Sequence, residues 1–152
     1  MARFFRRGVS KVRFCPAVAG TSPTRAELNA GVNLSPSVAA MSGFTLENSP
    51  IATPDLETTF DSQIKGPDAA GSSTITYYDD DTATAVRTSQ AKDTTGFMVL
   101  LPYGDVPGKR CEVWAVTSTG VNDQWGLDAA AAQFVVGYAI TARPTQSGVV
   151  PA

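Results

Sequence analysis

The sequence predicts a mainly β domain that carries two short helices. β-Branched residues, chiefly valine and threonine, outnumber leucine, and they suit a pleated sheet better than a helix. In addition, 13 glycines and 10 prolines divide the 152 residues into pieces of strand length. With 43% hydrophobic residues, the chain is long enough to form a single domain with its own core.

The clearest strand signal lies at residues 56–65, where the side chains alternate strictly in character. Leu56 and Phe60 fall on one face, whereas Glu57 and Asp61 fall on the other. This alternation predicts a strand with one half-buried face and one charged face in contact with water. Further strands are expected at 9–18, 38–46, 73–78, 97–101, 111–119 and 133–141.

Two short helices are expected on the surface of the β domain. Thr24 and Glu27 have the spacing of a capping box, and Gly31 is placed to end the helix that they begin. The acids Asp79–Asp81 suit a helix N-terminus, so a second helix is expected from there through Gln90. The same acids could bind a cation, but they lack the pattern of a calcium loop, so helix capping is the preferred interpretation.

The segment 48–54 joins two predicted strands that could pair as a hairpin. Pro50 and Pro54 stiffen this segment, and Ile51 is expected near its tip. An apolar residue at the tip of a loop is a liability unless another surface covers it.

The net charge of −2 conceals an uneven distribution. The first 26 residues hold six of the 12 basic residues and none of the 14 acids, so the rest of the chain has a balance of −8. We expect one domain over residues 1–145 with a basic arm at 1–14, followed by an irregular tail at 146–152. Such an arm suggests binding to nucleic acid, a membrane surface or another copy of the chain. We prefer another copy, because the acidic body would repel DNA.

Several function classes are disfavoured. The chain has no histidine, which removes the commonest general base and metal ligand. The pair Asp105 and Glu112 could do acid–base chemistry, but any acidic chain offers such a pair. Cys15 and Cys111 are expected to be buried thiols, and no apolar run is long enough to span a bilayer. The sequence therefore predicts no enzyme, no cofactor and no metal site.

A series of segments in order and spacing is similar to the major tail (tail tube) proteins of long-tailed, non-contractile phages that infect actinobacteria. The resemblance covers about residues 10–145. The segments that carry it are Pro23–Gly31, Val38–Phe44, Thr53–Phe60, Ser73–Tyr78, Thr95–Pro102, Gly104–Val106 and Ile140–Pro144.

The resemblance implies a β-sandwich or barrel-like tail tube fold with a helix on its flank and no catalytic residues. Six copies would form a ring, and stacked rings would form a tube through which genome DNA passes during ejection without being bound specifically. The implied partners are other copies of the chain, a tail terminator, and the tail tip and tape measure proteins. The implied location is the tail of the virion, assembled in the host cytoplasm, with no membrane partner.

Two sets of residues are expected to serve this assembly. The acids of the alternating strand, Glu57 and Asp61, together with Glu47, are expected to line the channel, because a lining of like charge keeps DNA from sticking. The second set is expected to contact the next ring or an adjacent subunit. It consists of Arg3, Arg6, Arg7, Lys11, Pro50, Ile51 and Pro54.

Two alternatives belong to other functional classes. A capsid decoration protein or a head–tail joining protein would share the β fold and the composition but would not form long tubes. A carbohydrate-binding module would need exposed aromatic residues, and Trp125 lies in a segment expected to be a loop, whereas Trp114 is expected to be packed in a strand.

Overall fold

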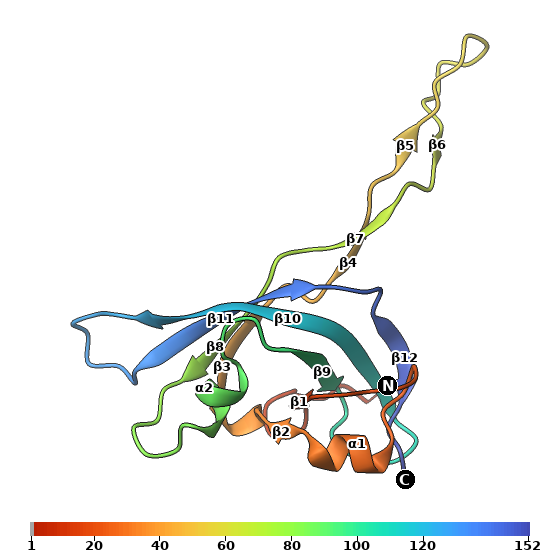
Figure 1. Cartoon of the computed structure of the whole chain (residues 1–152). Helices are drawn as coiled ribbons and strands as arrows, with labels where there is room; N and C mark the ends of the chain where they lie inside the picture. Colours follow the sequence, from red (N-terminus) through yellow and green to blue (C-terminus); the bar gives the residue numbers. More distant parts are fainter. Residues whose placement is uncertain (1) are drawn as a thin grey trace.

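The computed structural model describes residues 2–152, and the mainly β prediction is confirmed. Its largest part is an eight-stranded antiparallel sheet in the order β2-β1-β9-β10-β11-β8-β3, with β12 paired to β10 (Figure 1). The strands of this sheet are β1 (Lys11–Cys15), β2 (Val32–Asn33), β3 (Val38–Ser42), β8 (Ser73–Tyr78), β9 (Thr95–Leu101), β10 (Arg110–Gln124), β11 (Gln133–Ile140) and β12 (Thr145–Val149). The helices are α1 (Arg25–Ala30) and α2 (Ala85–Ser89), with a 3-10 turn, η1, at Ser35–Ser37.

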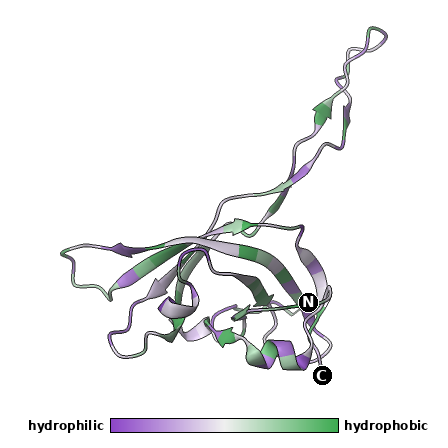
Figure 2. Ribbon diagram, viewed as in Figure 1, coloured by the Kyte–Doolittle hydropathy of each residue, from purple (hydrophilic) through white to green (hydrophobic). Residues whose placement is uncertain are grey.

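Alternate residues of the central strands face two separate hydrophobic clusters. Hydrophobic residues recur along the strands of the curved sheet (Figure 2). Met98 and Trp114 belong to the larger cluster. Their neighbours Val99 and Val113 point to the opposite face, where Leu28 of α1 covers them. Because successive side chains of a strand point to opposite faces, one run of apolar residues supplies both clusters. The sheet is therefore covered on both sides near its centre.

The capping box at the start of α1 is confirmed. The hydroxyl of Thr24 accepts a hydrogen bond from the N–H of Glu27, and the Glu27 carboxylate accepts one from the N–H of Thr24, at 3.2 and 3.0 Å. The carboxylate also accepts from the N–H of Ala19, at 2.8 Å. These bonds stabilise the ionised form and lower the pKa of Glu27. These bonds fix the residue at which the helix begins.

The second helix forms, but it is shorter than expected. It covers only Ala85–Ser89, because Asp80 closes a turn in front of it. The carboxylate of Asp80 accepts hydrogen bonds from the N–H groups of Thr82 and Ala83, at 2.9 and 3.0 Å. Asp80 thus closes a turn before the helix and does not cap it, since the N-cap residue is Thr84 and its side chain makes no capping bond, so the prediction that Asp79–Asp81 cap this helix is wrong.

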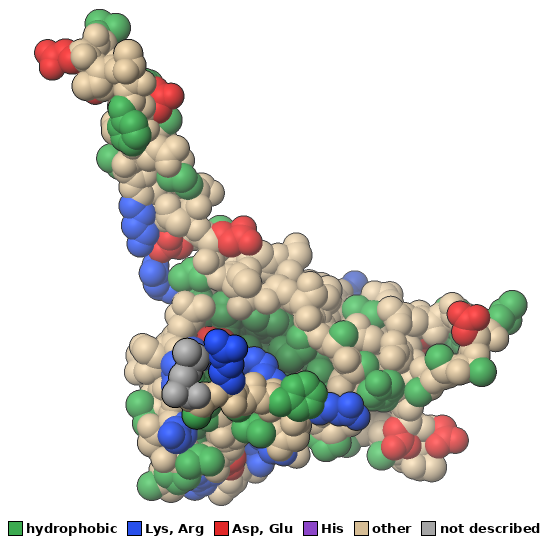
Figure 3. Space-filling view, turned by 180° about the vertical axis from the view of Figure 1, so that it is seen from behind, with side chains coloured by type: hydrophobic (Ala, Val, Ile, Leu, Met, Phe, Trp, Pro, Cys, Tyr) green, Lys and Arg blue, Asp and Glu red, His purple; other side chains and the backbone are tan. Residues whose placement is uncertain are grey.

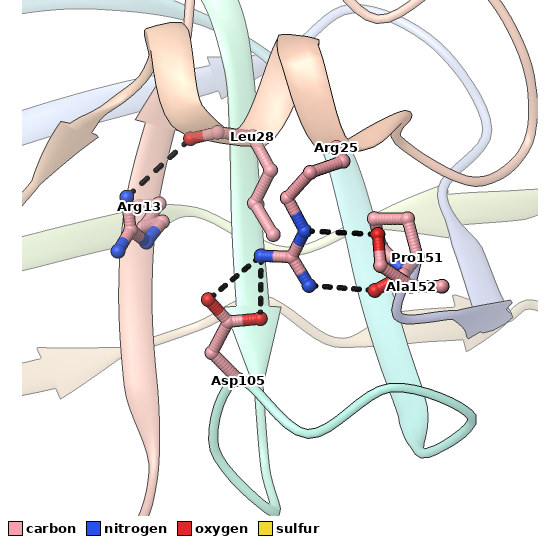
Figure 4. Close-up of polar contacts among 6 residues, drawn as sticks. All are labelled: Arg13, Arg25, Leu28, Asp105, Pro151 and Ala152. Carbon is pink, nitrogen blue, oxygen red and sulfur yellow. Dashed lines mark hydrogen bonds and ion pairs between the residues drawn. The ribbon is translucent and has the colours of Figure 1, made fainter.

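The prediction of an irregular C-terminal tail at 146–152 is wrong. Residues 145–149 form β12, which pairs with the start of β10, and Val150 is buried in the smaller cluster. Arg25 holds the end of the chain, because its guanidinium donates to the carbonyl oxygens of Pro151 and Ala152 at 2.6 and 3.3 Å (Figure 4). The same guanidinium binds both oxygens of Asp105, at 3.0 and 2.9 Å.

The prediction of a continuous strand at 38–46 is also wrong. The chain leaves the large sheet after Ser42, because Gly43 and Phe44 have positive φ angles of 88° and 55°. A side chain at Gly43 would lie 2.3 Å from the carbonyl oxygen of Ser72, so the close approach of the two chain segments requires glycine. From this bend the chain enters a long projection.

The projection, residues 45–72, extends away from the sheet as a narrow hairpin (Figure 1). It is called the arm below and is distinct from the basic N-terminal segment at residues 1–14. It contains two short ladders. The pairs are β4 (Leu46–Asn48) with β7 (Asp68–Ala70), and β5 (Ile51–Ala52) with β6 (Gln63–Ile64).

The strand predicted at 56–65 is wrong, since only Gln63–Ile64 is a strand and the chain reverses direction before it. The carboxylate of Asp55 accepts hydrogen bonds from the N–H groups of Glu57 and Thr58, both at 2.9 Å, and closes a turn. The alternation of residues 56–65 is real, but no second strand or core covers its apolar face.

The remaining sequence expectations concern the thiols and the membrane. Cys15 and Cys111 are buried and unpaired, as expected, and burial raises the pKa of Cys15 to about 11. Trp114 is fully buried. Among the described residues, the helices are too short and too polar to cross a bilayer.

Candidate assembly surfaces

The root of the arm is fastened to the domain by polar contacts. Asp68 of β7 accepts hydrogen bonds from Asn48, at 2.6 Å, and from Arg143 of the domain, at 2.8 Å. Lys65 lies 3.3 Å from the same carboxylate. These contacts, first the bond from Asn48, lower the pKa of Asp68 to about 2. The arm therefore leaves the domain in a defined direction.

The middle of the arm is held narrow by hydrogen bonds between its two sides. Thr53 and Ser62 exchange bonds through backbone and side chains, including a 2.8 Å bond from the N–H of Thr53 to the carbonyl of Ser62. Gly66 lies so close to Ser49 that a Cβ atom there would lie 1.8 Å from its carbonyl oxygen. The arm is thus a narrow hairpin whose two sides are joined by hydrogen bonds along its length.

The tip of the arm, residues 55–61, combines exposed apolar and acidic side chains (Figure 3). Leu56 is fully exposed and Phe60 is 77% exposed. Asp55, Glu57 and Asp61 lie in the same short segment and are also exposed. Exposed leucine and phenylalanine side chains in one short segment at the end of a projection make the tip a candidate contact surface.

The predicted channel residues do not form one surface. Glu57 and Asp61 lie at the tip, whereas Glu47 lies on β4 at the root of the arm and is exposed. The regular strand that placed the first two acids on one face is absent. The prediction that these three acids line a channel depends on how copies of the chain are arranged, and it stays a prediction.

The predicted contact residues fall into two groups. Pro50, Ile51 and Pro54 lie along the arm and not at its tip, since Ile51 pairs with Ile64. The sequence interpretation missed the true tip, although Pro54-Asp55 is a dipeptide typical of turns and could have revealed it.

The basic group lies around the N-terminus, on the main body of the domain. Arg3, Arg6 and Arg7 are exposed, and Lys11 is partly buried as the first residue of β1. The Arg6 guanidinium carbon lies 5.7 Å from the centre of the Phe4 ring. The Phe4 ring in turn lies 5.3 Å from the ring of Tyr103, centre to centre. Residues 11–14 of the predicted basic arm are thus part of the sheet, and the preceding residues contact the domain.

A surface groove that the sequence did not indicate lies beside this basic group. It has a volume of about 300 Å³ and lies between the N-terminal segment, the end of β3 and the strands β9 and β10. Hydrophobic side chains gather in the hollow below the root of the arm, with Lys and Arg side chains beside it (Figure 3). The groove is lined by Val12, Met41, Phe44, Leu100, Leu101 and Pro102, and its rim carries Arg6, Lys11, Arg110 and Glu112.

The loop between β10 and β11 exposes a second apolar pair. Trp125 is 90% exposed and Leu127 is fully exposed. The base of this loop is anchored, because Arg87 of α2 binds both carboxylate oxygens of Asp123, at 2.6 and 3.0 Å, and lies over the Phe134 ring. The expectations that Trp114 is packed in a strand and that Trp125 lies in a loop are confirmed.

A β domain with a projecting arm, an exposed apolar tip and a surface groove has the features of a structural protein that assembles through its surfaces. The chain belongs to the phage tail tube protein family, because the model of that family matches residues 1–152. Its role is accordingly structural, in the tube of a virion tail, and the family is not a class of enzymes. Among curated proteins, no relative matches the sequence.

Solved structures with a similar fold include a chain from a tail and a chain from a baseplate. A chain from the tail of an empty GTA particle, determined with C6 symmetry, is similar with a TM-score of 0.57 and 11% identity, over 96% of this chain and 99% of that one. A chain from the 6-fold symmetrised baseplate of the anti-feeding prophage has a TM-score of 0.55 and 10% identity, over 95% and 97%. At such low identity the likeness concerns the fold alone.

Proposed function

We propose that six copies of the chain form a ring and that stacked rings form the tail tube through which genome DNA passes during ejection. Family membership and the tail tube fold support this proposal, and the GTA tail of similar fold was determined with C6 symmetry. The same proposal includes contacts with a tail terminator, a tail tip protein and a tape measure protein. It also includes assembly in the host cytoplasm and a non-contractile tail of a phage that infects actinobacteria.

The observation that carries this proposal is the arm. The exposed leucine and phenylalanine at the tip of this projection contribute favourable free energy when another molecule covers them. The partner in a tube is another copy of the chain. Pro50, Ile51 and Pro54 along the arm, and Arg3, Arg6, Arg7 and Lys11 around the N-terminus, are the surfaces proposed to contact the next ring or the adjacent subunit.

The charge distribution supports DNA passage without specific binding. Residues 27–152 have a balance of −8, and DNA carries about one negative charge per 1.7 Å of axis, so an acidic channel lets DNA slide. Glu47, Glu57 and Asp61 are the residues proposed to contribute to such a lining.

Negative-stain microscopy of the purified protein tests the proposal. Tubes or six-fold rings are expected, and deletion of residues 2–8 is expected to reduce the length and yield of tubes. A protein that stays monomeric at high concentration would contradict the proposal. Rings that never stack would instead favour a head–tail joining protein. Tubes of unchanged length and yield after the deletion would show that the N-terminal segment does not contribute to the contact between copies.

A further inference from the structure

We propose that the loop between β10 and β11, residues 125–132, forms a binding site for a neutral saccharide. The site consists of the exposed indole of Trp125 and a hollow beside it that is lined by polar side chains. It adds a recognition function to the structural role of the protein, and it does not depend on contacts between copies of the chain.

The hollow lies where three parts of the chain meet. It has a volume of about 440 Å³ and is formed by the residue after β8, the end of β10, and the loop that leads into β11. Ligand sites in proteins have volumes of roughly 300–1,000 Å³, so the hollow has room for one or two sugar rings. Residues 130–132, all alanines, leave its wall free of bulky side chains. The polar side chains that line it are Asp79, Asp123, Gln124, Asp128 and Gln133.

The indole of Trp125 supplies an apolar platform at the edge of the hollow. It lines the hollow and is nevertheless 90% exposed. A sugar ring has C–H groups on one face, which pack on an aromatic face, and hydroxyl groups around its edge. A saccharide therefore needs one flat aromatic side chain with hydrogen-bonding groups beside it, and this loop combines the two.

The polar side chains of the hollow match the hydrogen bonding of sugar hydroxyls, each of which both donates and accepts. The amides of Gln124 and Gln133 can donate and accept in return. The carboxylates of Asp79 and Asp128 accept, and such charge-assisted bonds are stronger than neutral ones. The same carboxylates repel anionic sugars. The ligand class is therefore a neutral saccharide.

Contacts within the chain hold the walls of the hollow in place. The Arg87 guanidinium binds both carboxylate oxygens of Asp123, at 2.6 and 3.0 Å, and lies 3.8 Å from the carboxylate of Asp79. The N–H of Asp79 donates to the carbonyl oxygen of Ala132, at 2.8 Å. Because these contacts join both sides of the loop to the domain, binding of a ligand has little ordering entropy to overcome.

Tryptophan fluorescence tests the site without a label. The chain has two tryptophans and Trp114 is fully buried, so quenching by acrylamide reports on Trp125. The probes are dextran, glucomannan and xylan as neutral polysaccharides, and polygalacturonate as an acidic one. At least one neutral polysaccharide should protect the indole from quenching, and polygalacturonate should not. Protection by none of the neutral probes would overturn the proposal, as would protection by polygalacturonate alone.

Variants of the loop separate a built site from a merely apolar surface, with retardation in gels that contain the polysaccharide as the measurement. Trp125→Ala should weaken binding about tenfold, because the apolar contact is lost, and Trp125→Phe should keep part of it. Asp128→Ala should weaken binding about fivefold through the loss of a charge-assisted bond. Leu127→Ala is the matched control, since Leu127 is fully exposed in the same loop but does not line the hollow. Equal losses in Trp125→Ala and Leu127→Ala would overturn the proposal.

The competing occupant of the loop is another copy of the chain, and assembled tubes distinguish the two. The indole of Trp125 should stay open to acrylamide in tubes, and tubes should bind the polysaccharide roughly 10²- to 10⁴-fold more tightly than single copies, because many sites engage one polymer. An indole that is covered in tubes, with assembly impaired in both Trp125→Ala and Leu127→Ala, would identify a contact between copies and overturn the saccharide site. A protein that forms no tubes would contradict the proposed function alone, since saccharide binding is also measured on single copies.

Discussion

The most informative perturbation removes the apolar side chains at the tip of the arm. In the double variant Leu56→Ser, Phe60→Ser, the folded monomer should keep its stability within about 0.5 kcal/mol, since both side chains are exposed and touch no core. Assembly should suffer far more, because covering a leucine or phenylalanine is worth about 1.5–3 kcal/mol each. The loss of about 3–6 kcal/mol per contact corresponds to a rise of about 10²- to 10⁴-fold in the concentration needed for tubes.

Pelleting of assembled protein over a concentration series measures this rise, and calorimetry of the unassembled protein measures the stability. Val106→Ser is the matched control, since it removes an exposed apolar side chain elsewhere and should leave assembly unchanged. An unchanged assembly concentration in the tip variant would refute the reasoning about the arm. A large drop in melting temperature would show that the tip contributes to the fold of the single chain.

Three further predictions concern the single chain. Arg25→Ala should lower the free energy of unfolding by about 1–2 kcal/mol in calorimetry, because Asp105 and the carbonyl oxygens of Pro151 and Ala152 lose their common partner at a partly exposed site. The pKa of Asp68 is lowered to about 2, so the stability that its carboxylate contributes to the root of the arm is complete above its ordinary pKa and is lost as the pH falls from about 4 toward 2. The protection of the arm amides, measured as hydrogen exchange relative to the intrinsic rate at each pH, should fall over that range, and Asp68→Asn should abolish this dependence. Cys15 and Cys111 should react with a thiol reagent only after denaturation, and rapid reaction of the native protein would contradict their burial.

Local signals predicted the elements that local chemistry determines. The capping box of Thr24 and Glu27 contains its own hydrogen bonds, and the strand predicted at Ser73–Tyr78 has the bounds of β8. In both segments the conformation follows from residues that are close in the sequence, through capping bonds in the helix and alternating side chains in the strand. These elements could therefore be predicted without knowledge of their partners.

Elements determined by distant partners were not predictable in the same way. β12 contains Gln146 and Gly148, which have low strand propensity, and it forms because β10 offers a pairing edge. The alternation at 56–65 indicated a sheet face, but the turn at Asp55 and the lack of a covering surface decided the outcome. The groove has no local signal at all, since its floor and rim come from four separate parts of the chain.

The fixed length of the arm has a consequence for the dimensions of the virion. In a tube assembled through the arm, the position of the tip relative to its own domain defines where the next copy must be. The arm then acts as a molecular ruler for the spacing between rings. Removing two residues from each of its sides would shorten it by about 7 Å and keep the alternation of faces, so the axial repeat of the tube would shorten by the component of that length along its axis.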